Sequence, residues 1–358
     1  MIIAKIPSNI KISAINELSP SKYTWLKDGC AYSFVLESAL RSYGTPSLLM
    51  PPATTKNVIG TIIHKIFQLV YSARLNATEE AITAKWKELC NIYRNKIQEE
   101  FPTLGNVRVV DYDKMFETID VILDTFQESH NAPSGNYTDI KNPNEHFIKL
   151  DGLLKGSIDR IRYVSGGIEI VDYKTGKVYD DNGDIKKDYI DQLNLYAYML
   201  EEKEGVTVSK LTIIDHCGNE IDAPYDRKAK TNIFNSIKCL ISDINEAIAS
   251  GMPETLAKPS NENCCLCPCL HLCRRRVCSS NDTFQIIEGK VMKVLNNDQL
   301  LIRDNDGNQI IIAKLCPLNL SGFDSFQDKI LIFVNLLKIQ ENVLYNRCDR
   351  TVIYERSQ

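Results

Sequence analysis

The run Gly167-Ile168-Glu169-Ile170-Val171-Asp172-Tyr173-Lys174 decides the fold of this chain. Its apolar and β-branched residues predict a β-strand. The turn residues Ser165-Gly166 come just before it, so we expect a hairpin in which Val164 pairs with Gly167. Because side chains alternate between the two faces of a strand, Asp172 and Lys174 are expected on the same face.

Two carboxylates and one ammonium group gather at the end of this predicted hairpin. The same register places Asp159 directly opposite Asp172, with Cβ atoms about 5 Å apart. Like charges side by side in a sheet are destabilising without a counter-ion. The alternative is a solvated hairpin with scattered charges. Because Asp159 lies in a mostly apolar stretch and Thr175-Gly176 ends the strand just after Lys174, we favour a divalent cation shared by the two carboxylates.

The composition limits the classes of protein that fit. The chain has 358 residues, of which 44% are hydrophobic and 25% charged, as expected for a globular protein of about two domains. A net charge of −4 excludes a polycation that coats nucleic acid, so any DNA contact must come from local patches. No apolar run reaches membrane-spanning length and the N-terminus lacks a signal-peptide layout, so we expect a cytoplasmic protein without membrane association.

The pattern along the chain predicts two domains. Residues 1–281 carry both helical periodicity and strand patterns, and we expect a first domain there with a helical insertion at about 61–130. Within this part we expect helices at 79–100, 113–129 and 228–250, and strands from 147 to 174 and at 211–214. Five short β-rich runs follow in residues 282–358 and predict a small all-β barrel. We place these runs at 284–295, 299–302, 309–314, 330–337 and 343–354.

Three further residues are candidates for the site around Asp172. His64 lies on a predicted helix, where a lone histidine is more often a core or surface residue. Beside the two carboxylates it adds a nitrogen ligand, a mixture that suits Mg²⁺ or Mn²⁺. Gln192 and Tyr196 lie one helical turn apart and share a face. They are either an exposed glutamine with a half-buried tyrosine or two groups that position phosphate or water near Lys174.

Six of the twelve cysteines fall within the fifteen residues from Cys264 to Cys278. In a cytoplasmic chain this density indicates metal binding rather than disulfides. Two metals fit. A zinc ion could be held locally by Cys264, Cys267, Cys273 and Cys278, and a 4Fe-4S cluster would also take four thiolates. The adjacent Arg274-Arg275-Arg276 either contacts phosphates or forms a solvated basic turn.

Four segments, in this order, resemble the motifs of RecB-type PD-(D/E)XK nucleases. They are Gly60-x-x-x-His64, Gly156-Ser157-Ile158-Asp159-Arg160-Ile161, Asp172-Tyr173-Lys174-Thr175-Gly176 and Gln192-Leu193-x-x-Tyr196. The resemblance implies an α/β fold in which helices flank a mixed sheet. It also implies metal-dependent cleavage of DNA and the residue roles. His64, Asp159, Asp172 and the Tyr173 carbonyl would bind the metal, Lys174 would orient or activate water, and Gln192 and Tyr196 would support the site.

The cysteines resemble the iron–sulfur branch of the same family, which includes AddB-type subunits and the CRISPR-associated iron–sulfur exonucleases. Cys264-x-x-Cys267-Pro268 and Cys273 match that pattern, and Cys30 stands where the branch has its N-terminal ligand. The implied cofactor is a 4Fe-4S cluster on Cys30, Cys264, Cys267 and Cys273. Three cysteines are additional to that pattern and leave the ligand set open: Cys265, Cys269 and Cys278.

We therefore expect a Mg²⁺- or Mn²⁺-dependent deoxyribonuclease that acts on single-stranded or free-ended DNA in repair, CRISPR or antiphage defence. The expected partners are DNA and a helicase or defence-complex protein. The alternative is a non-catalytic subunit that grips DNA or a helicase with the same fold and cluster. Residues 282–358 lie outside the family pattern and resemble an OB-like barrel, which binds single strands or docks a protein.

Overall fold

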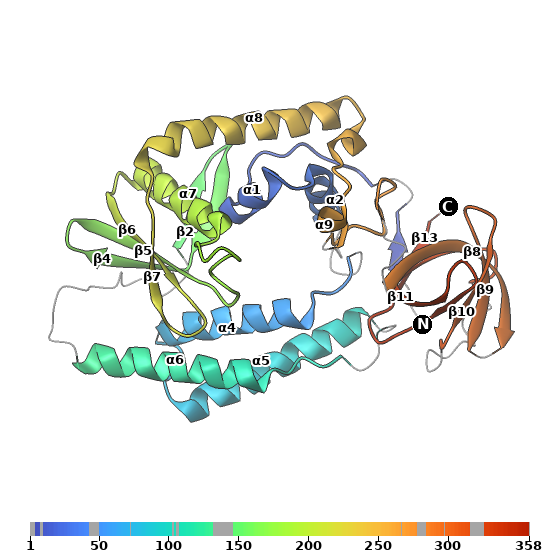
Figure 1. Ribbon diagram of the computed structural model, residues 1–358, viewed down its shortest axis with the longest axis horizontal. Coiled ribbons are helices and arrows are strands. Elements are labelled where there is room, and N and C mark those ends of the chain that lie inside the picture. The colour runs from blue at the N-terminus through green and yellow to red at the C-terminus, as the bar shows by residue number, and fades with distance from the viewer. Residues whose placement is uncertain are drawn as a thin grey trace.

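The computed structural model describes residues 4–7, 10–42, 50–71, 73–101, 104, 107–131, 146–265, 267–277, 284–296, 298–315 and 326–357. Figure 1 shows a small sheet with helices on both sides and, beyond them, a separate barrel of C-terminal strands. The mixed α/β architecture fits the predicted fold.

The site is built on a four-stranded sheet with the order β4-β5-β6-β7. Strands β4 (Arg160–Val164) and β5 (Gly167–Tyr173) are antiparallel, and Val164 lies opposite Gly167. This register confirms the predicted hairpin. Strand β6 (Val208–Ile214) runs parallel to β5, and β7 (Glu220–Ala223), which the sequence patterns missed, pairs with its other edge.

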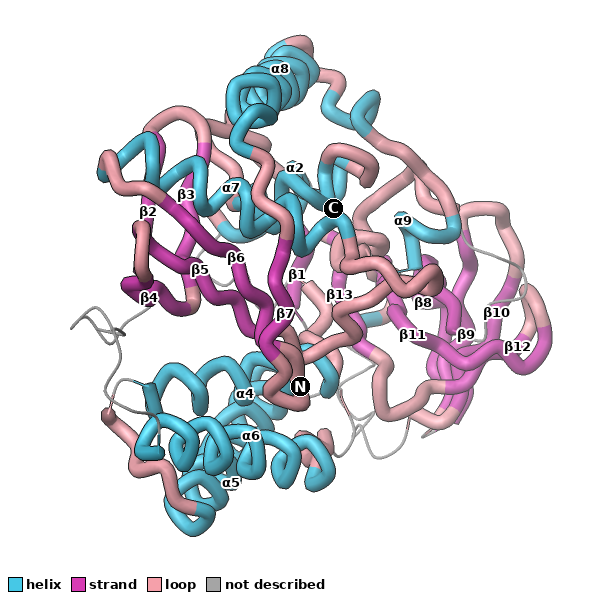
Figure 2. The backbone as a smooth tube through the Cα atoms, turned by 60° about the vertical axis from the view of Figure 1, so that its left-hand side comes forward, coloured by secondary structure: helices cyan, strands magenta, loops and turns pink. Residues whose placement is uncertain are grey.

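Helices cover both faces of this sheet. On one side, α7 (Lys187–Glu204) connects β5 to β6 and packs with α1 (Pro20–Leu26) and α8 (Lys230–Ala249). On the other side lie α4 (Thr55–Tyr71), α5 (Glu79–Glu100) and α6 (Tyr112–Asn131), as Figures 1 and 2 show. Helix α4 begins at Thr55, before the predicted start of the helical insertion at about residue 61. It starts there because the Thr54 hydroxyl accepts the Asn57 N–H at 3.3 Å, which ends the preceding loop.

The remaining elements of this part are short or lie around the sheet. They are α1 (Pro20–Leu26), α2 (Ala31–Arg41), the hairpin of β2 (His146–Leu150) and β3 (Leu154–Ile158), η1 (Arg227–Ala229), α8 (Lys230–Ala249), η2 (Pro253–Leu256) and α9 (Asn261–Cys265). The predicted helices at 79–100, 113–129 and 228–250 correspond to α5, α6 and α8. No helix in the described parts of the chain has the length and apolar character needed to cross a bilayer.

The C-terminal strands close into a barrel-like sheet that fits an OB-like domain. The closed ring runs β8-β9-β10-β12-β11 and back to β8, with β10 and β12 parallel. Its strands are β8 (Phe284–Asn296), β9 (Gln299–Asp304), β10 (Gln309–Ala313), β11 (Ile330–Gln340) and β12 (Leu344–Asn346). The predicted single run at 343–354 is wrong. A turn closed by the Cys348 N–H and the Thr351 hydroxyl at 2.9 Å separates β12 from β13 (Val352–Arg356).

The N-terminal strand belongs to this C-terminal sheet. Strand β1 (Ala4–Ile6) pairs in parallel with β13, with Ile6 opposite Arg356. Ile6 is only 1% exposed and lies in the same hydrophobic core as Tyr354 of β13 and Leu40 of α2. The division of the chain at residue 281 therefore stays a prediction. In this pairing, a strand from before that position joins the sheet formed by residues after it.

We expect Ile6→Ala to lower the free energy of unfolding by about 2–5 kcal/mol, because it empties space in a core shared by both parts of the chain. Chemical denaturation checks this value. Lys5→Ala is the matched control, since Lys5 is its neighbour in β1 and its side chain is 64% exposed. Equal stability of the two variants would show that the core does not include β1.

Candidate active site and thiol pocket

Asp159 stands at a bend between β3 and β4, beside the end of β5. Its Oδ2 accepts a hydrogen bond from the Tyr173 backbone N–H at 3.0 Å. The Nδ1 of His64 lies 3.7 Å from the same oxygen. The structure thus brings the predicted imidazole and the first predicted carboxylate together at the strand end.

Asp172 and Lys174 meet on the same side of β5, as strand alternation predicts. The Lys174 Nζ lies 2.7 Å from Asp172 Oδ2, and the two side chains are 15% and 7% exposed. Gln192 of α7 links the pair, accepting from Lys174 Nζ at 3.0 Å and donating to Asp172 Oδ1 at 3.4 Å. Asp172 Oδ2 makes no hydrogen bond of regular geometry within the described residues. Its negative charge is balanced by the Lys174 ammonium, which forms an ion pair with it.

Tyr196 supports the site through packing. A Cβ atom added at Gly156 would lie 3.0 Å from the Tyr196 hydroxyl and 3.1 Å from Pro20 Cδ. The absence of a side chain at Gly156 thus lets the tyrosine of α7 lie directly on β3, three residues before Asp159. In this position Tyr196 is buried and holds α7, and with it Gln192, against the strands.

Helix α4 is fixed against β5 on both sides of His64. Upstream, a Cβ atom at Gly60 would lie 3.3 Å from the Thr175 hydroxyl. Downstream, the Phe67 ring stacks on the Tyr173 ring with centroids 4.8 Å apart and planes 9° apart. These contacts set the position of His64 relative to the strand end.

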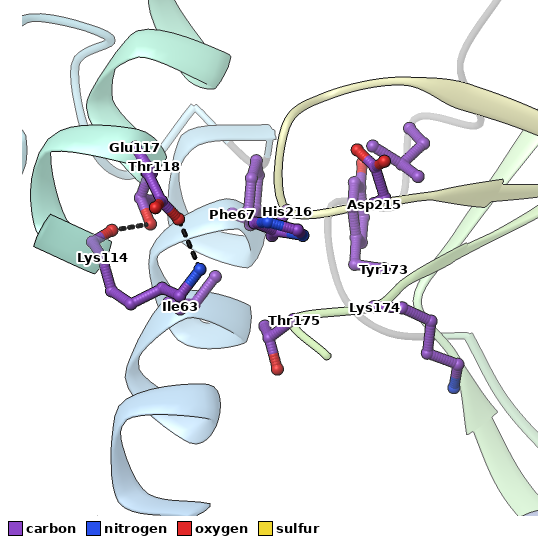
Figure 3. Close-up of a pocket in the computed structure, with 11 residues that line it drawn as sticks. Ile63, Phe67, Lys114, Glu117, Thr118, Tyr173, Lys174, Thr175, Asp215 and His216 are labelled. Atoms are coloured by element: carbon purple, nitrogen blue, oxygen red, sulfur yellow. Dashed lines mark hydrogen bonds and ion pairs between the residues drawn. The ribbon is translucent and has the colours of Figure 1, made fainter. Parts of the chain in front are cut away.

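A pocket lies behind the strand end, between α4, α6 and the turn from β6 to β7 (Figure 3). In this view the Lys174 ammonium points away from Phe67 and His216. The sequence patterns missed Asp215 and His216. The carboxylate of Asp215 accepts the N–H groups of Cys217 at 2.8 Å and Asn219 at 2.9 Å, so it closes the turn. An acidic residue followed by Gly218-Asn219 is a turn signal that predicts this role.

Another residue that the sequence patterns missed is Tyr189. Its ring centroid lies 4.6 Å from Lys174 Nζ. Helical spacing could have indicated it, because Tyr189 is three residues before Gln192 and shares its face of α7.

The donors around Asp172 suit a hard divalent cation, since they are two carboxylates and an imidazole. Among the described residues, however, no three His, Cys, Asp or Glu side chains are close enough to count as a preformed metal site. Instead they form two contacts, His64 with Asp159 and Asp172 with Lys174, joined by the backbone of Tyr173. The buried carboxylate of Asp172, whose side chain is 7% exposed, is the observation that fits a cation.

A second pocket lies between Cys30 of the N-terminal part and the cysteine-rich segment. Cys30, Cys264, Cys267 and Cys273 all line one pocket. Cys30 is the N-cap residue of α2, and its Sγ accepts the Lys258 N–H at 3.4 Å. The Cys267 thiol donates to the Ser33 hydroxyl at 3.2 Å. Burial raises the pKa of both Cys267 and Cys273, so each holds its proton when no metal competes for the sulfur.

The other residues of the cysteine-rich segment take different positions. Cys269 is fully buried, and burial raises its pKa strongly, as expected of a structural thiol. Cys278 and the side chain of Cys265 lie outside the described residues, so the local zinc set stays untested. Arg274 and Arg275 are exposed, whereas Arg276 donates to the Cys273 carbonyl at 3.3 Å.

Comparison with known proteins gives a family match and weak similarities to solved structures. The model of the family described as "PD-(D/E)XK nuclease superfamily" matches residues 17–274, more than half of the chain. No curated protein sequence matches. A solved structure of a candidate exonuclease from Eubacterium rectale is 13% identical and has a TM-score of 0.37, covering 75% of this chain and 91% of that one.

We expect Gly156→Ala to lower the free energy of unfolding by about 1–3 kcal/mol, because the new methyl group overpacks the contact between β3 and α7. Gly60→Ala is the matched control. Its methyl group meets only a hydroxyl that can rotate, and alanine favours a helix by up to about 1 kcal/mol. Denaturation curves should therefore separate the variants, and a destabilised Gly60→Ala beside an unaffected Gly156→Ala would contradict the packing described.

Proposed function

Because this chain belongs to the PD-(D/E)XK nuclease superfamily, we propose that it is a Mg²⁺- or Mn²⁺-dependent nuclease that hydrolyses DNA phosphodiester bonds. The observation that carries the proposal is the buried carboxylate of Asp172, paired at 2.7 Å with Lys174 and linked to Gln192. A purely structural hairpin does not need a buried acid and ammonium side by side, because burying two charges costs free energy.

The proposed metal ligands are His64, Asp159, Asp172 and the Tyr173 carbonyl. A bound divalent cation would polarise the phosphoryl oxygen and lower the pKa of a bound water. The Tyr173 N–H holds the Asp159 carboxylate at 3.0 Å, and the Gln192 amide holds that of Asp172 at 3.4 Å. These two contacts orient the acids before any ligand arrives, which is how supporting hydrogen bonds act in metal sites.

Lys174 is the proposed group that orients or activates the attacking water. Its ammonium would also stabilise the negative charge that grows on the phosphate group in the transition state. Gln192 accepts a hydrogen bond from this ammonium, and Tyr196 holds the helix that carries Gln192. The proposed catalytic groups are thus Asp159, Asp172 and Lys174, and the two residues of α7 position them.

The proposed substrate is single-stranded or free-ended DNA. The closed five-stranded barrel fits an OB-like domain, a fold that often binds single strands. Arg274 and Arg275 are exposed and available to phosphates. A role in repair, CRISPR or antiphage defence, with a helicase or defence-complex partner, follows from the resemblance to iron–sulfur nucleases.

We also propose a 4Fe-4S cluster on Cys30, Cys264, Cys267 and Cys273. The four thiols reach one pocket from sequence positions that are far apart. Cys30 starts α2, so a ligand bond there would tie this helix to the loop between α9 and the barrel. Zinc on the same thiols is the alternative.

We expect Asp172→Asn and Lys174→Met to lower DNA cleavage at least about 100-fold, because each removes a charged group from the reacting centre. The measurement follows end-labelled linear single strands, linear duplex, circular single strands and RNA, with Mg²⁺, Mn²⁺ or EDTA. Asp222→Asn is the control, since this acid lies on the same sheet with a side chain 75% exposed. Melting curves show whether each variant folds.

Three outcomes of this experiment test the action at free ends, the assigned site and the nuclease function. Cleavage of linear but not circular single strands supports action at free ends, whereas equal cleavage of circles contradicts it. Metal-dependent cleavage that persists in both variants overturns the assigned site. Absence of hydrolysis by the folded natural protein with either metal favours the non-catalytic subunit.

We expect Cys30→Ser to lose bound iron and visible absorbance, and to lower stability, because metal–thiolate bonds contribute to folding. Cys239→Ser, at an exposed cysteine of α8, is the control. Metal content and spectra are measured on anaerobically purified protein. Colourless protein with zinc in both variants would show that Cys30 is not a ligand of an iron–sulfur cluster.

A further inference from the structure

Among the described residues, three groups hold the ammonium of Lys174, and one of them belongs to no motif discussed above. Asp172 Oδ2 lies at 2.7 Å and Gln192 Oε1 at 3.0 Å. The third is the ring of Tyr189, whose centroid lies 4.6 Å from Lys174 Nζ. This distance is within the range of a cation–π interaction.

The position of Tyr189 is set by its surroundings. It lies in the first turn of α7, and its backbone N–H donates to the Lys186 carbonyl at 2.9 Å. A Cβ atom at Gly176 would be 3.7 Å from the Tyr189 hydroxyl, an ordinary contact, so the ring lies against the segment that follows the strand. A second ammonium, that of Lys186, is 5.7 Å from the same ring. The half-buried ring therefore faces two positive charges.

The three contacts of Lys174 differ in what else they bind. Asp172 is a proposed metal ligand, so its oxygens serve two cations. Gln192 is shared as well, since its amide group also donates to Asp172. The ring face of Tyr189 attracts an ammonium through its quadrupole and offers a hard divalent cation no charged oxygen ligand. Its attraction for Lys174 consequently does not weaken when Asp172 takes a metal.

We propose that Tyr189 is a positioning residue that keeps the Lys174 ammonium at the site while the Asp172 carboxylate is engaged with a divalent cation. The inference rests on the proposed nuclease function. It assigns a specific chemical property, the electron-rich ring face, to a tyrosine whose hydroxyl is not needed. We therefore expect kcat of variants at position 189 to follow the quadrupole strength of the ring rather than its capacity for hydrogen bonding.

The test measures kcat and KM for single-stranded DNA with Mn²⁺. Tyr189→Leu should lower kcat about 3- to 30-fold with little change in KM, the range that a cation–π interaction supplies. Tyr189→Phe should stay within about twofold of the natural protein, because the ring remains. Tyr163→Leu is the control, since this tyrosine of β4 is 44% exposed and pairs with Ile168 at the far end of β5.

A second series of variants tests the proposal even where Tyr189→Leu misfolds. Phenylalanines with increasing numbers of fluorine atoms, placed at position 189, keep the ring shape while they weaken the negative ring face. A stepwise fall of kcat with each added fluorine supports the proposal. A kcat that is flat across the series, or an equal loss in Tyr189→Phe and Tyr189→Leu, overturns it.

A Mn²⁺ titration separates this inference from the function on which it rests. Tyr189→Leu should bind Mn²⁺ as tightly as the natural protein, whereas Asp172→Asn should bind it less tightly. Reduced Mn²⁺ affinity in Tyr189→Leu would mean that the ring shapes the metal site itself, and would overturn the positioning role. If the natural protein cleaves and Tyr189→Leu matches it, only the role of Tyr189 fails. If the natural protein cleaves nothing, the nuclease proposal fails first.

Discussion

The antiparallel register between β4 and β5 is the constraint on which the candidate site depends. With Val164 opposite Gly167, the start of β4 and the end of β5 coincide, and Asp159 arrives beside Tyr173 and Asp172. A slip of one residue would turn every side chain of one strand to the opposite face. The register is secured by burial on both sides of β5, where Ile170 and Val171 are fully enclosed in different cores. Apolar packing thus fixes the geometry of the charged groups.

Much of this arrangement could be predicted from the sequence, and the reasons are local. The turn at Ser165-Gly166 and strand alternation predicted the hairpin and the shared face of Asp172 and Lys174, because both rules act between neighbours. The family resemblance, and no periodicity, linked Cys30 to the distant cysteines with which it lines one pocket. Tyr189 and His216 escaped notice because their contacts arise only when α7 and the turn after β6 are brought to the strand end.

The cysteine-rich loop connects three parts of the chain. Its Cys267 touches Ser33 of α2, its Cys269 lies in the core shared with the barrel, and the His271 ring stacks on Tyr354 of β13 with centroids 4.8 Å apart. Backbone hydrogen bonds within the loop, such as that from the Leu272 N–H to the Cys269 carbonyl at 3.0 Å, close local turns only, so contacts with neighbouring elements must fix its position. A metal bound by thiols from both sides would reinforce an attachment that packing already makes.

The parallel pairing of β1 with β13 has a consequence for how the protein is made. On the ribosome, β1 emerges before nearly all of the rest of the described chain, yet its partner strand comes last among the described strands. Until β13 has been made, the apolar face that carries Ile6 has no sheet to join and can contact other chains. Closing so long a loop is slow, so the pairing of β1 with β13 is a late event in folding. Incomplete translation products that lack β13 should therefore be most prone to aggregate through the exposed apolar face of β1.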